Sequence, residues 1–186
     1  MDSADVRRAL DESLSLLAPI ADDRWAAPAG GLDWTCLQTA EHIAHDLMAY
    51  ATQLASGADG RYLPLDLVLR AGTDPATVLQ IVAASGHLLG LALDAAGPEA
   101  TAWHWGPTDR TGFAALGVNE ILVHTWDIAQ GLGLDWTPPA DLAAQVLARL
   151  FAHVEGADDL LWATGRRALP GRPRRAEWTV RAALRY

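Results

Sequence analysis

The chain has 186 residues, of which 51% are hydrophobic, so it is long and apolar enough to form a domain with a sizeable core. The net charge is −9 and the sequence pI is near 4.9, whereas a nucleic-acid-binding domain usually presents a basic face. The single cysteine, Cys36, excludes an internal disulfide and fits a reducing compartment. Ala and Leu dominate the composition, which favours helices.

The first half of the chain predicts two helices. Apolar residues recur at helical spacing over residues 4–20, and a loop follows. The second helix is predicted over residues 35–56. It starts with a capping box, in which the Thr35 hydroxyl and the Gln38 amide satisfy free backbone N–H groups. Gly57 is placed to end this helix.

Three further helices are predicted in the second half. The third lies within residues 72–97, with Asp74 as its N-cap and Pro75 as its first residue. A connector rich in Trp and Pro separates it from a fourth helix at about 112–131, and a fifth begins after Thr137. No segment predicts a convincing strand.

The C-terminal residues 158–186 are predicted to be mostly loop, with a short helix near 179–184. This segment is rich in Pro and Gly and holds the only basic cluster, which indicates a solvated loop. The cluster consists of Arg166, Arg167, Arg172, Arg174 and Arg175.

Four long helices without strands predict an all-α fold, a four-helix bundle forming a single domain over residues 1–186. The connections are longer than in a minimal up-and-down bundle, so we expect at least one long crossover. No apolar run approaches the roughly 18–20 residues of a membrane span. The N-terminal sequence is acidic and amphipathic, unlike a signal peptide. We therefore expect a cytoplasmic protein that binds neither nucleic acid nor membrane.

The fourth helix carries the chemistry that needs explaining. Glu120, His124 and Asp127 fall within a stripe about 60° wide on a helix that is otherwise mostly apolar. A charged Glu in a buried seam is costly unless something pairs with it. A divalent metal is one such partner, because residues four apart on a helix point to one place. An ordinary helix-face ion pair between Glu120 and His124 is the alternative.

The second helix supplies candidates for a third ligand. His42 is our choice and His45 the alternative, and Asp46 shares a face with His42. Two histidines and one carboxylate with an open position form a recognised catalytic arrangement for zinc and for ferrous iron. Asp127 is then expected to support His124 from outside the ligand set, or to anchor the helix end. A buried core histidine is the alternative for His42.

Other residues are expected to shape a pocket or to have no chemical role. Cys36 is interpreted as a small residue at a helix start, so we assign no nucleophile to the protein itself. The predicted walls of a substrate pocket combine aromatic and histidine side chains, and Asp46 is a candidate supporting group or general base. The predicted wall residues are Trp34, His45, Trp103, His104 and Trp126.

Three segments resemble a known family. "LDWTCLQTAEHIAHDL" resembles the W-T-x-x-x-x-x-x-H segment of the second helix of the DinB superfamily, and more narrowly of the mycothiol-dependent maleylpyruvate isomerase metal-binding domain. "NEILVHTWDIAQGLG" is similar to the E-x-x-x-H-x-x-D helix of that group, and "LLWATGRRALPG" to the segment after its last helix. The resemblance covers about residues 5–170.

The resemblance implies a DinB-like four-helix bundle whose metal, usually zinc, is held by His42, Glu120 and His124, with water as fourth ligand. Characterised relatives use the metal to activate a low-molecular-weight thiol, mycothiol, toward an electrophile or for isomerisation. Full isomerases of the group carry a further C-terminal domain, for which these 186 residues have no room. Related proteins often pair through helix faces, so a homodimer is one expectation.

The leading hypothesis is therefore a zinc-dependent, mycothiol-using transferase or isomerase acting on a small electrophile. A non-catalytic metal-binding or stress-linked protein is the second hypothesis. A hydrolase using metal-bound water, with Asp46 as general base, is the third.

Overall fold

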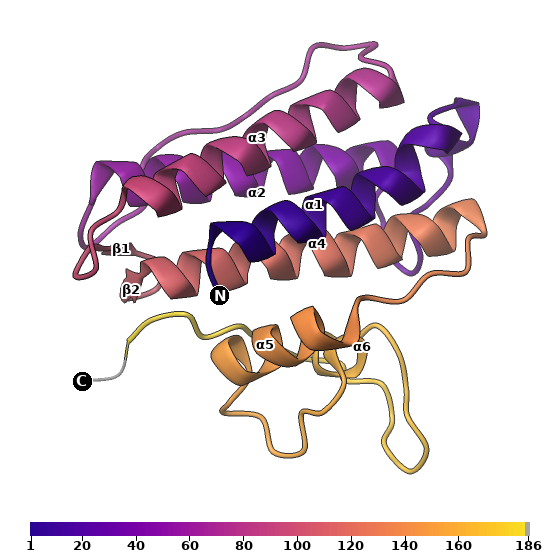
Figure 1. Cartoon of the computed structure of the whole chain (residues 1–186). Helices are drawn as coiled ribbons and strands as arrows, with labels where there is room; N and C mark the ends of the chain where they lie inside the picture. Colours follow the sequence, from indigo (N-terminus) through magenta and orange to yellow (C-terminus); the bar gives the residue numbers. More distant parts are fainter. Residues whose placement is uncertain (185–186) are drawn as a thin grey trace.

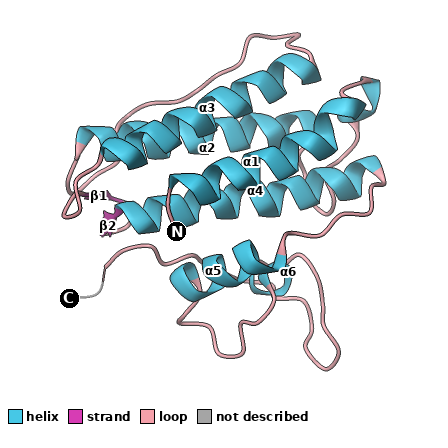
Figure 2. Cartoon of the chain, viewed as in Figure 1, coloured by secondary structure: helices cyan, strands magenta, loops and turns pink. Residues whose placement is uncertain are grey.

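A computed structural model describes residues 1–184 of the chain, and it is mostly helical (Figure 2). Four long helices form the main body: α1 (Ser3–Leu17), α2 (Cys36–Ser56), α3 (Pro75–Ala95) and α4 (Arg110–Leu132). Two short 3₁₀ turns, η1 (Ala18–Ile20) and η2 (Asp23–Ala26), follow α1. The expected all-α character is confirmed.

The long helices begin and end where local side chains satisfy the backbone. Thr35 and Gln38 form the predicted capping box of α2, and Gly57 ends that helix at a positive φ of 61°. Asp74 accepts the N–H of Thr77 and so caps α3. These ends confirm the predicted bounds of α2 to within a residue.

The four long helices pack in a square in which sequence neighbours are not always spatial neighbours (Figure 1). α1 packs against α3 and α4, and α2 packs against the same two helices. The chain therefore crosses the diagonal of the square between α1 and α2, through the loop that contains η1 and η2. This is a long crossover of the kind expected, and it places α2 and α4 side by side.

α4 lies at the centre of the packing and is buried along most of its length. One of its buried polar groups, the Thr125 hydroxyl, lies 2.7 Å from the Ser13 hydroxyl on α1. α5 (Ala140–Leu150) packs against the other side of α4, and α6 (Leu160–Ala163) packs against α5. The titratable side chains further along α4, Glu120, His124 and Asp127, are thus at most 12% exposed.

Two strands form where the sequence predicted none. β1 (Thr101–Trp103) and β2 (Pro107–Asp109) pair antiparallel as a hairpin that leads into α4. Trp105 at the hairpin tip has a φ of 56°, and the next residue, Gly106, has a φ of 141°. The alternating burial of these three-residue strands was too short a pattern to detect in the sequence.

The predicted helix near 179–184 is wrong, because that stretch is irregular. Its backbone is committed to other parts of the chain: the Arg181 N–H donates to the Leu150 carbonyl, and the Leu184 N–H donates to the Pro107 carbonyl. Residues 185 and 186 lie outside the described part. The short helix of the C-terminal segment is α6 instead.

One expectation about membranes also needs correction. α3 has the length and the mean hydropathy, 1.7 over its most apolar 18 residues, of a helix able to cross a membrane. It packs against α1 and α2, and 44% of that window is buried in the structure. Core helices pass the same test, so this feature alone is weak support for a span.

Candidate metal centre

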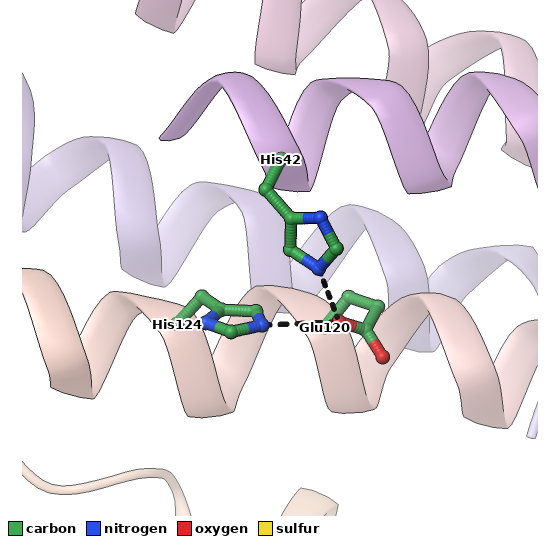
Figure 3. A group of neighbouring side chains, drawn as sticks. All are labelled: His42, Glu120 and His124. Atoms are coloured by element: carbon green, nitrogen blue, oxygen red, sulfur yellow. Dashed lines mark ion pairs between the residues drawn. The ribbon is translucent and has the colours of Figure 1, made fainter. Parts of the chain in front are cut away.

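Three side chains from two helices meet beside α4, as Figure 3 shows. Glu120 and His124 are one turn apart on α4, and His42 reaches them from α2. The Nε2 atoms of His124 and His42 lie 3.3 and 3.6 Å from the same oxygen, Oε2 of Glu120. One donor atom from each of the three residues lies within 4.8 Å of the others. The structure thus brings together the three predicted ligands.

Glu120 is oriented by its neighbour and held as an anion. The Asn119 amide donates to Oε1 at 3.3 Å, which leaves Oε2 to face the histidines. Burial alone would raise the pKa of Glu120, but hydrogen bonds and charge from His124 and His42 outweigh it and hold that pKa well below its usual range. Among residues 1–184, Glu120 forms ion pairs with these two histidines and with no Arg or Lys.

His124 is held from its other ring nitrogen. Its Nδ1 lies 3.0 Å from Oδ2 of Asp127, and because a carboxylate only accepts, Nδ1 carries the hydrogen. Burial lowers the pKa of His124, but the Asp127 and Glu120 carboxylates outweigh burial and raise it to about 9. Asp127 therefore contacts the ring nitrogen of His124 that faces away from Glu120, and its role in supporting a metal ligand stays a prediction.

Asp127 has a second partner that the sequence analysis missed. The Arg166 guanidinium donates from Nη2 to Oδ2 at 2.9 Å, and its Nε lies 3.3 Å from both carboxylate oxygens. The side chains of Arg166 and Asp127 are only 7% and 2% exposed. The prediction of a solvated arginine cluster is thus wrong for Arg166, because a buried acid on α4 pairs with it.

Asp46 forms a second polar group beside His42. Its Oδ2 lies 3.6 Å from Nε2 of His42 and accepts a hydrogen bond from the Tyr50 hydroxyl at 3.2 Å. Its other oxygen lies 2.9 Å from Nδ1 of His45. His45 in turn reaches the exposed Asp66 at 3.4 Å. Asp46 thus contacts His42 but lies outside the group of three whose donor atoms are all within 4.8 Å of one another.

A cavity of about 400 Å³ opens onto this group, within the size range of ligand pockets. α2 and α4 form one side of it, and the loop before α2 and the segment after α6 form the others. It is lined by Gly31, Leu32, Trp34, His42, Asp46, Glu120, His124, Trp126, Asp127, Thr164, Gly165, Arg166, Arg174 and Trp178.

The predicted pocket walls divide into two groups. Trp34 and Trp126 line the cavity, and the Trp34 ring lies 4.8 Å from that of His42, centroid to centroid. His45, Trp103 and His104 do not line it, unlike the prediction. His45 is turned toward Asp66, and the hairpin carries the other two to a separate place.

His104 belongs to an aromatic cluster at the hairpin. Its ring lies 5.7 Å from Tyr50, 5.9 Å from Tyr62 and 6.5 Å from Phe113, all edge-on. Burial lowers the pKa of His104, so its neutral form is favoured. His104 is therefore a buried residue that packs the hairpin against the aromatic side chains around it.

The donor set fits a divalent cation. Two imidazole nitrogens and one carboxylate oxygen suit zinc and other borderline metals, and a carboxylate on the far side of a ligating histidine is a common companion of zinc ligands. The group borders a cavity, so a small molecule has room beside it. Cys36 is buried at the start of α2, and burial raises the pKa of its thiol to about 11.

These features define a class: a helical protein in which two histidines and a glutamate from adjacent helices face a cavity with metal-binding spacing. The comparison with protein families identifies one family within this class. The model of the mycothiol maleylpyruvate isomerase N-terminal domain family matches residues 6–129, two thirds of the chain, and the chain belongs to that DinB-like family. The comparisons with curated proteins and with solved structures gave no match.

The matched region contains all three candidate ligands and Asp127. It ends before α5, so the family match does not reach the segment that supplies Arg166, Arg174 and Trp178 to the cavity. The similarity noted in that segment, "LLWATGRRALPG", lies outside the matched residues. These three wall residues therefore have to be interpreted from the structure.

Proposed function

We propose that this protein is a zinc-dependent enzyme that uses a low-molecular-weight thiol, mycothiol, for transfer or isomerisation on a small electrophile. The observation that carries the proposal is the convergence of two imidazole Nε2 atoms and one carboxylate oxygen at the edge of a cavity. Membership of a mycothiol-associated family supports the choice of thiol. We place the protein in the cytoplasm, where such a thiol is available, and treat the four long helices as a DinB-type bundle.

The residues of the chain divide the work in this proposal. His42, Glu120 and His124 hold the metal, and a bound zinc ion would lower the pKa of a thiol that binds to it. Trp34 and Trp126 provide apolar walls that exclude water from the reacting atoms. The protein contributes no nucleophile, because Cys36, its one thiol, is buried and holds its proton at neutral pH.

One observation favours a second candidate function. The Asp46 carboxylate lines the cavity and stands 3.6 Å from Nε2 of His42, where a general base for a metal-bound water would be useful. A metal-dependent hydrolase would turn over substrate without a thiol. The thiol-using enzyme would not, so the two functions separate in one assay with and without mycothiol.

The first experiment measures zinc in the purified protein and in two variants. His124→Ala removes a ligand, whereas His87→Ala removes an exposed histidine on α3. We expect about one zinc per chain in the wild type and in His87→Ala, and a large loss in His124→Ala. Equal zinc binding in wild type and His124→Ala would exclude the site.

Calorimetry with mycothiol then tests the thiol. We expect a binding heat with the zinc-loaded protein and none with the metal-free protein or with His124→Ala. A protein that binds zinc but gives no thiol heat would exclude the thiol-using enzyme. It would leave the hydrolase and a non-catalytic metal-binding module, which are separated by turnover in the absence of thiol.

A further inference from the structure

Arg166 joins the C-terminal segment to the candidate metal centre through one carboxylate. Arg166 lies just after α6, 39 positions beyond Asp127. Its guanidinium donates four hydrogen bonds, and three of them go to the two carboxylate oxygens of Asp127. The fourth goes to the Thr164 carbonyl, which accepts from Nη1 at 2.9 Å. The guanidinium is thus fixed from its own segment and from α4.

The surroundings leave the Arg166 guanidinium and the Asp127 carboxylate little freedom. The guanidinium carbon of Arg166 lies 5.1 Å from the centre of the Trp178 ring. Gly30 packs beside Asp127, since an added Cβ would stand 3.6 Å from Oδ1, in van der Waals contact. The carboxylate is consequently enclosed, and its orientation is set by the donors that reach it.

Oδ2 of Asp127 receives both Nη2 of Arg166 and Nδ1 of His124, at 2.9 and 3.0 Å. A carboxylate held at both oxygens by a planar guanidinium cannot rotate about its own bond without breaking several contacts. Its direction therefore fixes the imidazole plane of His124. Nε2 is then left to face Glu120 and the cavity.

We propose that Arg166 is a positioning residue of the metal centre, which holds Asp127 so that His124 presents Nε2, and not Nδ1, to a metal ion. The proposal rests on the metal-binding part of the proposed function. It assigns a role to a residue outside the region that defines the family, and it makes the C-terminal segment part of the site.

The direction of the change in zinc affinity distinguishes a positioning role of Arg166 from a simple effect of its charge. Removing a nearby positive charge would by itself tighten the binding of a cation, because the site becomes more negative. Losing the fixed orientation of a supporting carboxylate weakens metal binding, by about 10- to 100-fold for such partners. A weaker affinity in a variant without the guanidinium therefore reports lost positioning.

The experiment measures zinc affinity by competition with a chromophoric chelator in Arg166→Met, Arg166→Lys and Arg167→Met. Arg167 is the matched control, because it pairs with Asp159 in the same segment and does not line the cavity. We expect at least about a 10-fold loss in Arg166→Met. We expect an intermediate loss in Arg166→Lys, which keeps the charge without the planar fork, and wild-type affinity in Arg167→Met.

Nitrogen NMR of the zinc-loaded wild type adds a readout that does not depend on any variant. We expect His124 to show a slowly exchanging Nδ1–H with the metal on Nε2. A metal on Nδ1 would overturn the proposal, and so would folded Arg166 variants with unchanged or tighter zinc binding. Failure of the wild type to bind zinc would instead reject the proposed function.

Discussion

Gly131 in the last turn of α4 is a position where one added methyl group should destabilise the fold. A Cβ built there would lie 2.4 Å from the Pro28 carbonyl oxygen, 2.6 Å from Sγ of Cys36 and 3.1 Å from the Cα of Ala29. Two of these three neighbours are backbone atoms, so no side-chain rotation relieves the contact. The loop before α2 must move away from α4 instead.

The magnitude follows from two opposed effects. Replacing Gly by Ala inside a helix ordinarily stabilises by about 1 kcal/mol. Overpacking a tight contact costs about 1–3 kcal/mol, and more where the backbone must shift. Because the shortest contact at Gly131 is to backbone, we expect an overpacking cost near the upper end, about 3 kcal/mol, and hence a net loss of about 2 kcal/mol in Gly131→Ala. That corresponds to a Tm lower by roughly 2–4 °C per kcal/mol for a chain of this length.

Gly90→Ala on α3 is the matched control. Its added Cβ would meet only the far end of Arg7 at 3.4 Å and Cβ of Ser3 at 3.9 Å, which are ordinary contacts. Thermal and urea unfolding of both variants should therefore place Gly90→Ala at or above the wild type and Gly131→Ala clearly below it. Equal stabilities would show that the loop is free to move and that the close approach does not constrain it.

The remaining predictions concern the acid, the thiol and the hairpin histidine. Asp127→Ala leaves the buried Arg166 guanidinium unpaired, so urea unfolding should show a loss of about 3–5 kcal/mol, and a change below 1 kcal/mol would contradict a buried pair. Cys36 should resist a thiol reagent such as Ellman's in the native protein at pH 8, because a pKa of about 11 leaves roughly one thiol in a thousand ionised. The same thiol should react at once in denaturant. Fast labelling of the native protein would count against its burial. Because burial lowers the pKa of His104 in the folded state, the unfolded state binds more protons below its ordinary pKa near 6.5. The stability of the wild type relative to His104→Phe should therefore decrease as pH falls from 7.5 to 5, and a flat difference would show that this histidine is not desolvated.

The parts of the fold that the sequence predicted are those set by local chemistry. The capping box of Thr35 and Gln38 and the N-cap of Asp74 act within three residues, so their positions follow from the sequence pattern. The same holds for Glu120 and His124, which share a helix face by their spacing alone. Choosing His42 over His45 depended on helix-face geometry, and in the structure His45 contacts Asp46 and Asp66 and does not line the cavity.

The parts that it missed depend on contacts between distant segments. The irregular course of 179–184 is set by backbone bonds to Leu150 and Pro107, neither of which a local propensity can anticipate. The hairpin of β1 and β2 places Trp103 and His104 away from the cavity for the same reason. A sequence pattern reports which faces are apolar, and it does not report which distant segment covers them.

The sequence contains one indication that Arg166 is buried. Glu120, His124 and Asp127 share one stripe of a buried helix, and only the first two are needed as metal ligands. Asp127 is therefore a buried acid that requires another partner. The arginine cluster was the obvious source of one, but its Pro/Gly-rich surroundings favoured a solvated loop. The structure places Arg172 and Arg175 over Trp162 as well, at 4.6 and 5.2 Å, so the segment is held against the protein.

The ion pairs that attach the C-terminal segment contribute unequally to stability. Arg167 with Asp159 and Arg172 with Asp158 are at least partly exposed, and exposed pairs contribute about 0–1 kcal/mol each and are weakened by salt. The pair of Arg166 with Asp127 is shielded from water and is the one that reaches His124. Conditions that screen the surface pairs would thus loosen the edges of the segment while leaving its link to the metal centre intact. Coupling between the segment and the site is therefore a property of one buried guanidinium, and it does not follow from the net charge of the tail.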